Sequence, residues 1–253
     1  MKIQKIFYYI KSVLLLCKES KSKINFILSL LRLNSFYVFK NNLNFEIKSL
    51  LDLLILKETV IDDYYQLKKI EGTNPKIIVD IGGGFGDFSI FAAKLFPDAH
   101  ILVFEPNPIL SRFLRWNVSF NNIKNITIHS YAISNKREIQ IDISGEPTKT
   151  SMFFDRKKVS NTIKVKTKRL PDIIKKNTID FLKIDCKGGE WDILSNLSSQ
   201  ELTKINIISM EYHNQYIINL DEKIVKKLNQ RYIIVQKPDI FDKSIGHIYA
   251  TKK

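Results

Sequence analysis

The sequence predicts an α/β protein in which helices cover both faces of a mostly parallel sheet. Short apolar segments recur along the chain, helical patterns separate most of them, and a glycine-rich turn follows the segment at residues 77–81. Sheets of this kind bind ligands at the carboxyl ends of their strands. With 253 residues and 44% hydrophobic content, the chain can bury one substantial core. We therefore expect an N-terminal extension over residues 1–50 and one domain over residues 51–253.

The first predicted element is an amphipathic helix over residues 3–17. Its apolar residues recur at three- and four-residue steps, and lysines fall between them. Lys11 interrupts the apolar run, which is shorter than the roughly 18 to 20 residues that cross a bilayer. No small-residue cleavage site follows, which argues against a signal peptide. Two interpretations stay open: residues 1–33 lie on an anionic membrane, or the helix packs on the domain or a partner subunit.

The elements that follow alternate between helix and strand. A second apolar segment covers residues 24–33, a small hairpin joins residues 36–39 to residues 44–47, and residues 50–67 are predicted to be largely helical. Further helices are expected over residues 87–96 and 109–120. The expected strands cover residues 77–81, 101–104, 126–130, 138–143, 163–167, 179–185, 205–211, 232–236 and 245–251.

The glycine-rich turn indicates a nucleotide cofactor. Gly82, Gly84 and Gly86 are spaced two apart after the first strand of the domain. The dinucleotide fingerprint requires its third glycine three residues after the second, where this chain has Asp87. The spacing resembles that of S-adenosylmethionine-dependent methyltransferases, which favours a methyl donor over NAD. Asp80 is expected to face the cationic amino acid end of that donor.

A carboxylate after the next strand supports a ribose site. Glu105 follows the apolar segment at residues 101–104, about twenty residues beyond the glycines. A carboxylate at this position can accept hydrogen bonds from both ribose hydroxyls. Both cofactor classes use such an acid, so Glu105 does not choose between them.

Further polar residues follow two later strands. Asp185 ends the strand predicted at residues 179–185, and Glu190 stands at the start of the next helix. Glu211 and His213 follow the strand before residue 211. Because the carboxyl ends of parallel strands share one edge of the sheet, we expect these side chains near the cofactor. His213 is the candidate general base, oriented by Glu211.

Four motifs together resemble the FkbM family of class I S-adenosylmethionine-dependent methyltransferases. They are Val-Asp-Ile-Gly-Gly-Gly-Phe-Gly-Asp-Phe-Ser (residues 79–89), Phe-Glu-Pro-Asn-Pro (104–108), Lys-Ile-Asp-Cys-Lys-Gly-Gly-Glu (183–190) and Met-Glu-Tyr-His (210–213). The resemblance covers about residues 57–251 and leaves residues 1–50 unexplained. It implies a Rossmann-like, seven-stranded sheet with an antiparallel last strand. It also implies methyl transfer, usually to a hydroxyl oxygen of a sugar or natural product.

Matching this sequence to the family motifs position by position implies which residues form the site. Those expected to hold the cofactor are Asp80, Gly82, Gly83, Gly84, Phe85, Gly86, Glu105, Asn107, Asp185 and, near the adenine, Ala132 to Ser134. Asp185, Glu190 and His213 would also face the acceptor.

Two positions depart from the family pattern. Gly83-Gly84 replaces the usual Ala-Asn, and Lys187 stands where the family usually has Glu. A cation beside Asp185 and Glu190 would discourage a divalent metal, so we predict that no metal is required. Lys187 then has two open interpretations: it binds an anionic acceptor such as a phosphate or uronate, or it forms a structural ion pair with Glu190.

The net charge of +14 is concentrated in two segments. Residues 1–40 hold eight basic residues and one acid, and residues 149–176 hold ten basic residues and two acids. Such segments suit nucleic acid, an anionic membrane, a phosphorylated substrate or simply a solvated surface. Two distant cysteines suggest neither a disulfide framework nor a metal site. We expect a cytoplasmic protein, peripheral at the inner face of the membrane if the first helix lies on lipid.

The leading functional hypothesis is an O-methyltransferase that acts on a sugar of a glycan, a glycolipid or a lipid-linked oligosaccharide. An RNA methyltransferase is favoured by the charge, but the sequence has no aromatic-interleaved basic platform or recognisable RNA-binding module. A third hypothesis is a non-catalytic binding or scaffold protein that keeps the fold but has lost catalytic activity through the presence of Lys187.

Overall fold

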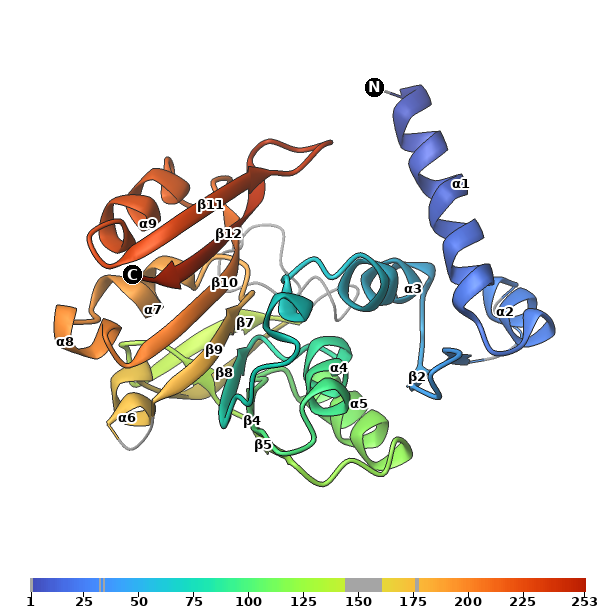
Figure 1. The fold of residues 1–253 in the computed structure, drawn as a ribbon, viewed down its shortest axis with the longest axis horizontal. Coiled ribbons are helices and arrows are strands. Elements are labelled where there is room, and N and C mark those ends of the chain that lie inside the picture. Colours follow the sequence, from blue (N-terminus) through green and yellow to red (C-terminus); the bar gives the residue numbers. More distant parts are fainter. Residues whose placement is uncertain (1, 32, 34, 144–160, 176–177) are drawn as a thin grey trace.

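The computed structural model describes residues 2–31, 33, 35–143, 161–175 and 178–253. Its centre is a seven-stranded sheet of order β11-β12-β10-β9-β3-β4-β5 (Figure 1). The strands are β3 (Ile77–Ile81), β4 (His100–Phe104), β5 (Ile126–His129), β9 (Ile179–Ile184), β10 (Ile205–His213), β11 (Tyr232–Pro238) and β12 (Ile245–Lys252).

The pairing confirms the predicted topology. β5, β4, β3, β9 and β10 pair in parallel, whereas β12 runs antiparallel to both β10 and β11. β3 and β9 form the middle of the sheet and are buried on both faces, as is typical of parallel strands. The last strand is therefore antiparallel, as the resemblance implied.

Helices cover both faces of this sheet. Alternate residues of β3 show the two layers, since Ile78 packs in one core with α4 and α5, and Val79 packs in another with α7 and α9. The helices of the domain are α4 (Asp87–Leu95), α5 (Pro108–Phe120), α6 (Leu170–Ile174), α7 (Glu190–Ser195), α8 (Ser199–Leu202) and α9 (Leu220–Leu228).

Two segments predicted as strands lie outside the main sheet. β7 (Glu138–Asp142) and β8 (Thr162–Lys168) pair antiparallel, and β8 also pairs with β6 (Ala132–Ile133) in a separate three-stranded sheet. Side chains of β7 alternate between exposed and buried, which is typical of a sheet covered on one face. Residues 149–160 and 176 of the second basic segment lie outside the described residues.

The N-terminal residues form α1 (Lys2–Glu19), α2 (Lys23–Leu30) and the predicted hairpin of β1 (Phe36–Val38) and β2 (Asn44–Glu46). The backbone N–H of Glu46 donates to Asn117 Oδ1 at 2.8 Å, which joins the hairpin to α5. Figure 1 shows α1 along the outer side of the molecule, away from the main sheet. None of the described helices is long and apolar enough to cross a membrane.

The helix predicted over residues 50–67 is shorter than expected. α3 (Leu50–Leu56) continues into a π-helical turn, Lys57–Ile61, and then stops. Asp63 and Gln66 adopt left-handed conformations with φ of 53° and 58°, which a continuous right-handed helix does not accommodate. The turn between them brings Tyr64 and Tyr65 toward the carboxyl edge of the sheet, where both line a cavity.

Candidate active site

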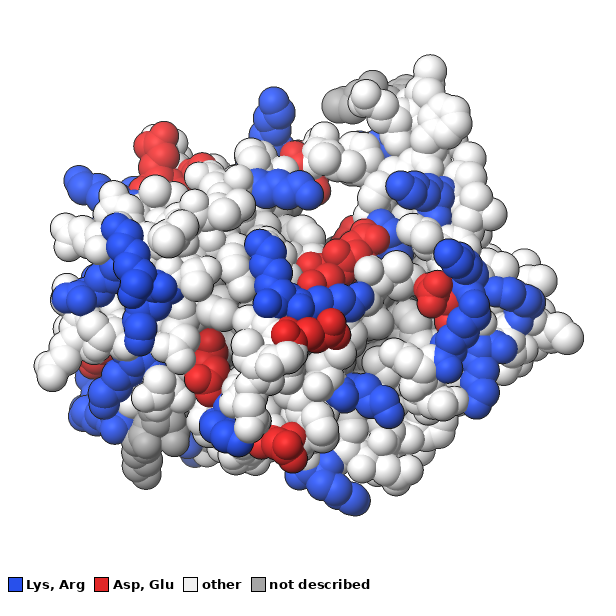
Figure 2. All heavy atoms as spheres, in the orientation of Figure 1, with Lys and Arg blue, Asp and Glu red and all other residues white. Residues whose placement is uncertain are grey.

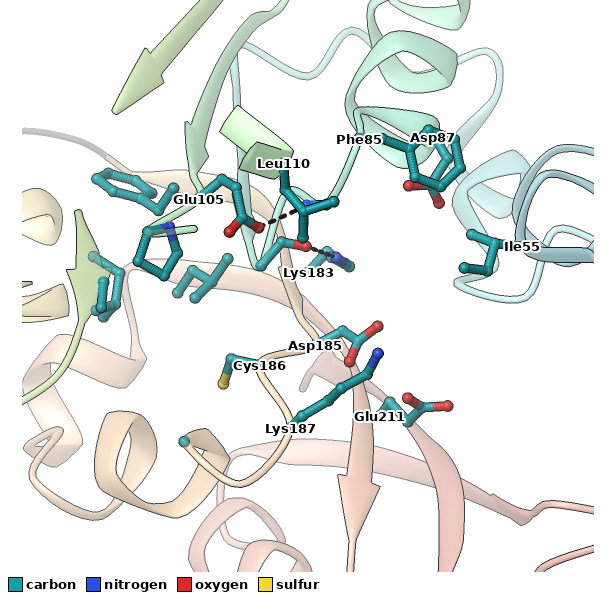
Figure 3. Close-up of a pocket in the computed structure, with 18 of the residues that line it drawn as sticks. Ile55, Phe85, Asp87, Glu105, Leu110, Lys183, Asp185, Cys186, Lys187 and Glu211 are labelled. Carbon is teal, nitrogen blue, oxygen red and sulfur yellow. Dashed lines mark hydrogen bonds between the residues drawn. The ribbon is translucent and has the colours of Figure 1, made fainter. Parts of the chain in front are cut away.

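A cavity of about 390 Å³ lies at the carboxyl ends of β4, β3, β9 and β10. Phe104 and Glu105 line it at β4, Gly82 at β3, Asp185 at β9 and Glu211 at β10. The strand order places the β4 residues at one end and Glu211 at the other. Figure 3 shows the side chains that converge on this space.

Two glycines bring the main chain to the cavity wall. Gly82 has a φ of +83°, and a Cβ there would lie 1.8 Å from the backbone oxygen of Asp185. Gly84 has a φ of +54°, and the one neighbour within 4 Å of its Cβ position is Asp87 Oδ1 at 3.6 Å. A side chain at Gly84 would therefore point into open space, so its absence lets a ligand approach the backbone.

The predicted contacts of Gly83 and Gly86 with the cofactor are not found. Neither residue lines the cavity. A Cβ at Gly83 would lie 2.3 Å from Val103, and a Cβ at Gly86 would lie 2.6 Å from Leu114. These two glycines thus allow close packing against β4 and α5, while Phe85 between them does line the cavity.

Glu105 lies on the cavity wall, as predicted. Its carboxylate accepts hydrogen bonds from the backbone N–H of Gly84 at 2.9 Å and of Asn107 at 2.7 Å (Figure 3 shows the first). Burial raises the pKa of Glu105 to about 7, although these two hydrogen bonds oppose the shift. Glu105 is therefore held rigidly by the glycine turn whose backbone also meets the ligand.

Asn107 does not reach the cavity, in contrast to the prediction. It is fully buried and caps α5, because its Oδ1 accepts a hydrogen bond from the N–H of Ile109 at 2.9 Å. Asparagine is a preferred residue at this position of a helix. Its contribution to the site is therefore to fix the start of α5 beside Glu105.

The end of the cavity beside β4 is apolar and suits a flat aromatic base. Phe104 and the predicted Ala132 line it together with Ile133. Ile139 and Ile141 of β7 complete this wall, and sequence reasoning missed them because they belong to the small sheet. Ser134 points elsewhere and donates a hydrogen bond to Asp192 at 2.6 Å.

Asp80 does not face the cavity, so its predicted contact with the donor is not found. It is fully buried, and its Oδ1 lies 3.0 Å from Lys183 Nζ, while Ser89 donates a hydrogen bond to its other oxygen. Lys183 lines the cavity instead and donates to the backbone oxygen of Gly82 at 2.6 Å. A lysine within the apolar run of residues 181–184 was the sequence signal for this role.

Lys183 keeps its proton. Burial by itself would lower the pKa of its ammonium, but the carboxylates of Asp80, Asp185 and Asp87 outweigh burial and raise it. A fixed positive charge therefore lies directly beneath the glycine turn.

Asp185 contributes its carboxylate to the cavity wall. Its Oδ2 accepts a hydrogen bond from Tyr65 at 2.9 Å, and its buried Oδ1 has no hydrogen-bond partner among the described residues. Burial alone would raise the pKa of Asp185, but Lys183, Lys187 and His213 lower it below its ordinary value. Asp185 therefore adds an ionised carboxylate to the cavity wall.

The structure does not support His213 as the general base. Its side chain is 4% exposed, does not line the cavity, and lies between two carboxylates. Nδ1 is 2.9 Å from Glu190 and Nε2 is 3.2 Å from Glu211. Burial would lower the pKa of His213, but these carboxylates raise it to about 10, so the ring is a cation at neutral pH. A protonated ring cannot accept a proton from a substrate.

Glu190 also lies behind the cavity wall. It is fully buried, and its carboxylate accepts hydrogen bonds from the N–H of Gly188 and is paired with His213. Lys187 extends toward Asp185 and Glu211 instead (Figure 3), in a left-handed conformation with a φ of 45°. Asp185, Lys187 and Glu211 line this end of the cavity, which we call the acceptor end, together with Glu58 and Tyr64.

These features fit S-adenosylmethionine. Glu105 can accept from the ribose hydroxyls, the apolar wall suits the adenine, and the open backbone at Gly84 suits the amino acid part. Asp185, an ionised carboxylate on the cavity wall, can bind the donor's ammonium, which is the role that the sequence assigned to Asp80. The bound cofactor supplies a methyl group on a sulfonium.

One cluster in the site has the spacing of a metal centre. Three potential ligand atoms lie within 4.8 Å of one another, one each from Asp185, Glu211 and His213. His213 already pairs with Glu211, and the positive charge of Lys187 acts on both carboxylates. Two cations therefore already lie beside the carboxylates that would attract a divalent ion, and the absence of a metal requirement stays a prediction.

We expect titration with Mg²⁺ or Mn²⁺ to give no calorimetric binding signal and no rise in melting temperature, because the cluster is already neutralised. Lys187→Glu is the matched variant: it replaces the cation by a third carboxylate and should acquire both responses. Metal-dependent stabilisation of the wild-type protein that EDTA reverses would show that the cluster is a metal site.

Comparisons with known proteins identify the family. The model of the methyltransferase FkbM domain matches residues 80–232, more than half of the chain. Methyltransferase sdnD of Sordaria araneosa is 26% identical over 195 residues, which cover 62% of this chain and 73% of that protein. Methyltransferase 1 of Beauveria bassiana is 22% identical over 181 residues, with coverages of 62% and 72%.

A solved structure of the methyltransferase domain of METTL16 shares the fold. It has a TM-score of 0.51 and 14% sequence identity, and the match covers 91% of this chain and 79% of that one. The family match, the sheet topology and the cavity agree with one another. The chain belongs to the FkbM family and is an S-adenosylmethionine-dependent methyltransferase.

Proposed function

We propose that this methyltransferase transfers its methyl group to a hydroxyl oxygen of a sugar in a glycan, glycolipid or lipid-linked oligosaccharide. The observation that carries the proposal is the position of Glu211. Its carboxylate lines the acceptor end of the cavity, accepts a hydrogen bond from Tyr64 at 3.0 Å and pairs with His213 behind it. A carboxylate so placed can orient a hydroxyl group and remove its proton.

Glu211 replaces His213 as the proposed base. Burial and the negative charge of Asp185 raise the pKa of Glu211, which makes its carboxylate a stronger base than an exposed glutamate. The acceptor oxygen bonds to the methyl carbon as the bond from carbon to sulfur breaks, and the hydroxyl proton passes to Glu211. His213 keeps Glu211 in place.

The charge of the wall favours a neutral acceptor. Among the described residues that line the cavity, five are acidic and two are basic, namely Glu58, Asp87, Glu105, Asp185 and Glu211 against Lys183 and Lys187. Carboxylates accept hydrogen bonds from the hydroxyls of a sugar ring but repel phosphates and uronates. We therefore favour a neutral sugar over the anionic acceptor that Lys187 by itself suggested.

The test is methyl transfer from deuterated S-adenosylmethionine to a panel of neutral glycosides, amino sugars, uronates, sugar phosphates and RNA transcripts, with mass spectrometry to locate the label. We expect the label on a hydroxyl oxygen of a neutral sugar. Glu105→Ala is the control, since it should weaken cofactor binding and abolish all transfer. Label on RNA, or cofactor binding without transfer to any sugar, would contradict the proposal.

A further inference from the structure

One face of α1 is apolar and exposed. Six apolar side chains recur along it at helical spacing, and between 38% and 69% of each is accessible to solvent: Ile3, Ile6, Phe7, Ile10, Val13 and Leu14. In a monomeric soluble protein a contiguous apolar surface of this kind usually marks an interaction site.

The opposite face of α1 packs on the rest of the protein, so the helix is not free to turn its apolar side inward. Ser12 and Leu16 are buried, and Tyr8 packs edge-on against Phe241 with ring centroids 5.2 Å apart. Tyr37 donates a hydrogen bond to the backbone oxygen of Leu16 at 2.7 Å. The structure thus holds the apolar face outward.

The apolar surface continues onto the next helix and is accompanied by lysines. Ile24 and Ile27 of α2 and the adjacent Leu31 are 72%, 52% and 62% exposed. Exposed lysines on these two helices and the turn between them are Lys11, Lys18, Lys21 and Lys23. Figure 2 shows basic side chains over this arm of the molecule, with few acidic ones among them.

We propose that the exposed face of α1 and α2 docks on the surface of an anionic lipid bilayer. Apolar side chains flanked by lysines are the pattern of helices that lie in the membrane interface. Negatively charged head groups complement the lysines, whereas in a self-associated dimer the lysines of the two copies would face one another. This docking does not depend on which acceptor the enzyme uses.

Docking also places the active site near the bilayer. The hydroxyl of Tyr8 on α1 donates to Glu58 at 2.5 Å, and Glu58 lines the acceptor end of the cavity. Because α1 contacts the cavity wall through its inner face, docking through its outer face would keep a sugar carried on a lipid close to the cavity. This consequence, unlike the docking itself, rests on the proposed function.

The test is co-sedimentation of the full chain with vesicles of phosphatidylcholine, with and without phosphatidylglycerol, at low and high ionic strength. We expect binding to the anionic vesicles that weakens with salt. A triple variant of α1, Phe7→Glu/Ile10→Glu/Leu14→Glu, removes apolar contact with the lipid, so we expect its binding to be at least about tenfold weaker. Lys11→Gln/Lys18→Gln should weaken it roughly fivefold per lysine.

A control variant carries three matching changes elsewhere on the surface, Ile218→Glu/Ile233→Glu/Val235→Glu, and should bind like the wild type. Melting temperature and S-adenosylmethionine binding should be unchanged in all three variants, which separates loss of docking from misfolding. Equal sedimentation of the wild type and the α1 variant would overturn the proposal. So would a wild-type dimer in light scattering that the α1 variant converts to a monomer.

Discussion

Lys183→Met should lower the free energy of unfolding by about 3–5 kcal/mol, the usual cost of removing one partner from a buried ion pair. The Lys183 and Asp80 side chains are 4% and 0% exposed. Methionine has a similar length and no charge, so the Asp80 carboxylate would remain buried without its cation. The variant also loses the hydrogen bond to the Gly82 oxygen, so weaker cofactor binding should accompany the instability. Chemical denaturation and calorimetry measure the two effects.

Two controls test the reason for this loss. Asp80→Asn/Lys183→Met removes both charges together and should recover much of the lost stability. Arg169→Met breaks an ion pair with Asp172 in which both side chains are about half exposed, and it should leave the denaturation midpoint unchanged. A Lys183→Met protein as stable as the wild type would show that the pair does not stabilise the fold.

Glu211→Gln should lower kcat by roughly 10²- to 10⁴-fold, the usual contribution of a general base. Glutamine keeps the shape of the side chain but cannot accept the hydroxyl proton. Because Glu211 lies at the acceptor end of the cavity, the affinity for S-adenosylmethionine should stay close to that of the wild type. Single-turnover methyl transfer and calorimetric titration separate the two quantities.

Glu58→Gln is the matched control, since Glu58 is also a carboxylate on the cavity wall but bonds to Tyr8. It should affect turnover less than Glu211→Gln does. If Asp185→Asn instead retained cofactor binding and lost more turnover than Glu211→Gln, Asp185 would be the base.

The pH profile of turnover follows from the same contacts. Turnover should rise with pH through the pKa of Glu211, which is above that of an ordinary glutamate, because the base must be ionised. It should fall again near pH 10, where His213 loses its proton and Glu211 loses its cationic partner. His213→Gln should abolish this alkaline limb while cofactor binding persists, as expected of a residue that positions the base.

The arrangement of strands could be predicted because it is encoded locally. Segments such as residues 77–81 and 179–184 are mainly apolar at both odd and even positions, which indicates parallel strands buried on both sides. The exception is β7, where Ile139 and Ile141 alternate with exposed residues. That alternation indicated a sheet covered on one face, but its partner strand lies more than twenty residues away, and local pattern does not identify it.

The sequence by itself determined which edge of the sheet carries the chemistry, since glycines and carboxylates that directly follow parallel strands must meet there. Glu105, Gly84 and Asp185 were found in this way. Which carboxylate faces the ligand was decided only by the tertiary structure. The register of β3 and β9 pairs Asp80 with Lys183, 103 residues later, so Asp80 is held away from the cavity, whereas Asp185 lies on its wall. His213 likewise becomes a cation because Glu190 and Glu211 reach it from two different elements. The ionisation of a buried side chain depends on the charged groups around it, and here those groups come from distant parts of the sequence that only the folded sheet brings together.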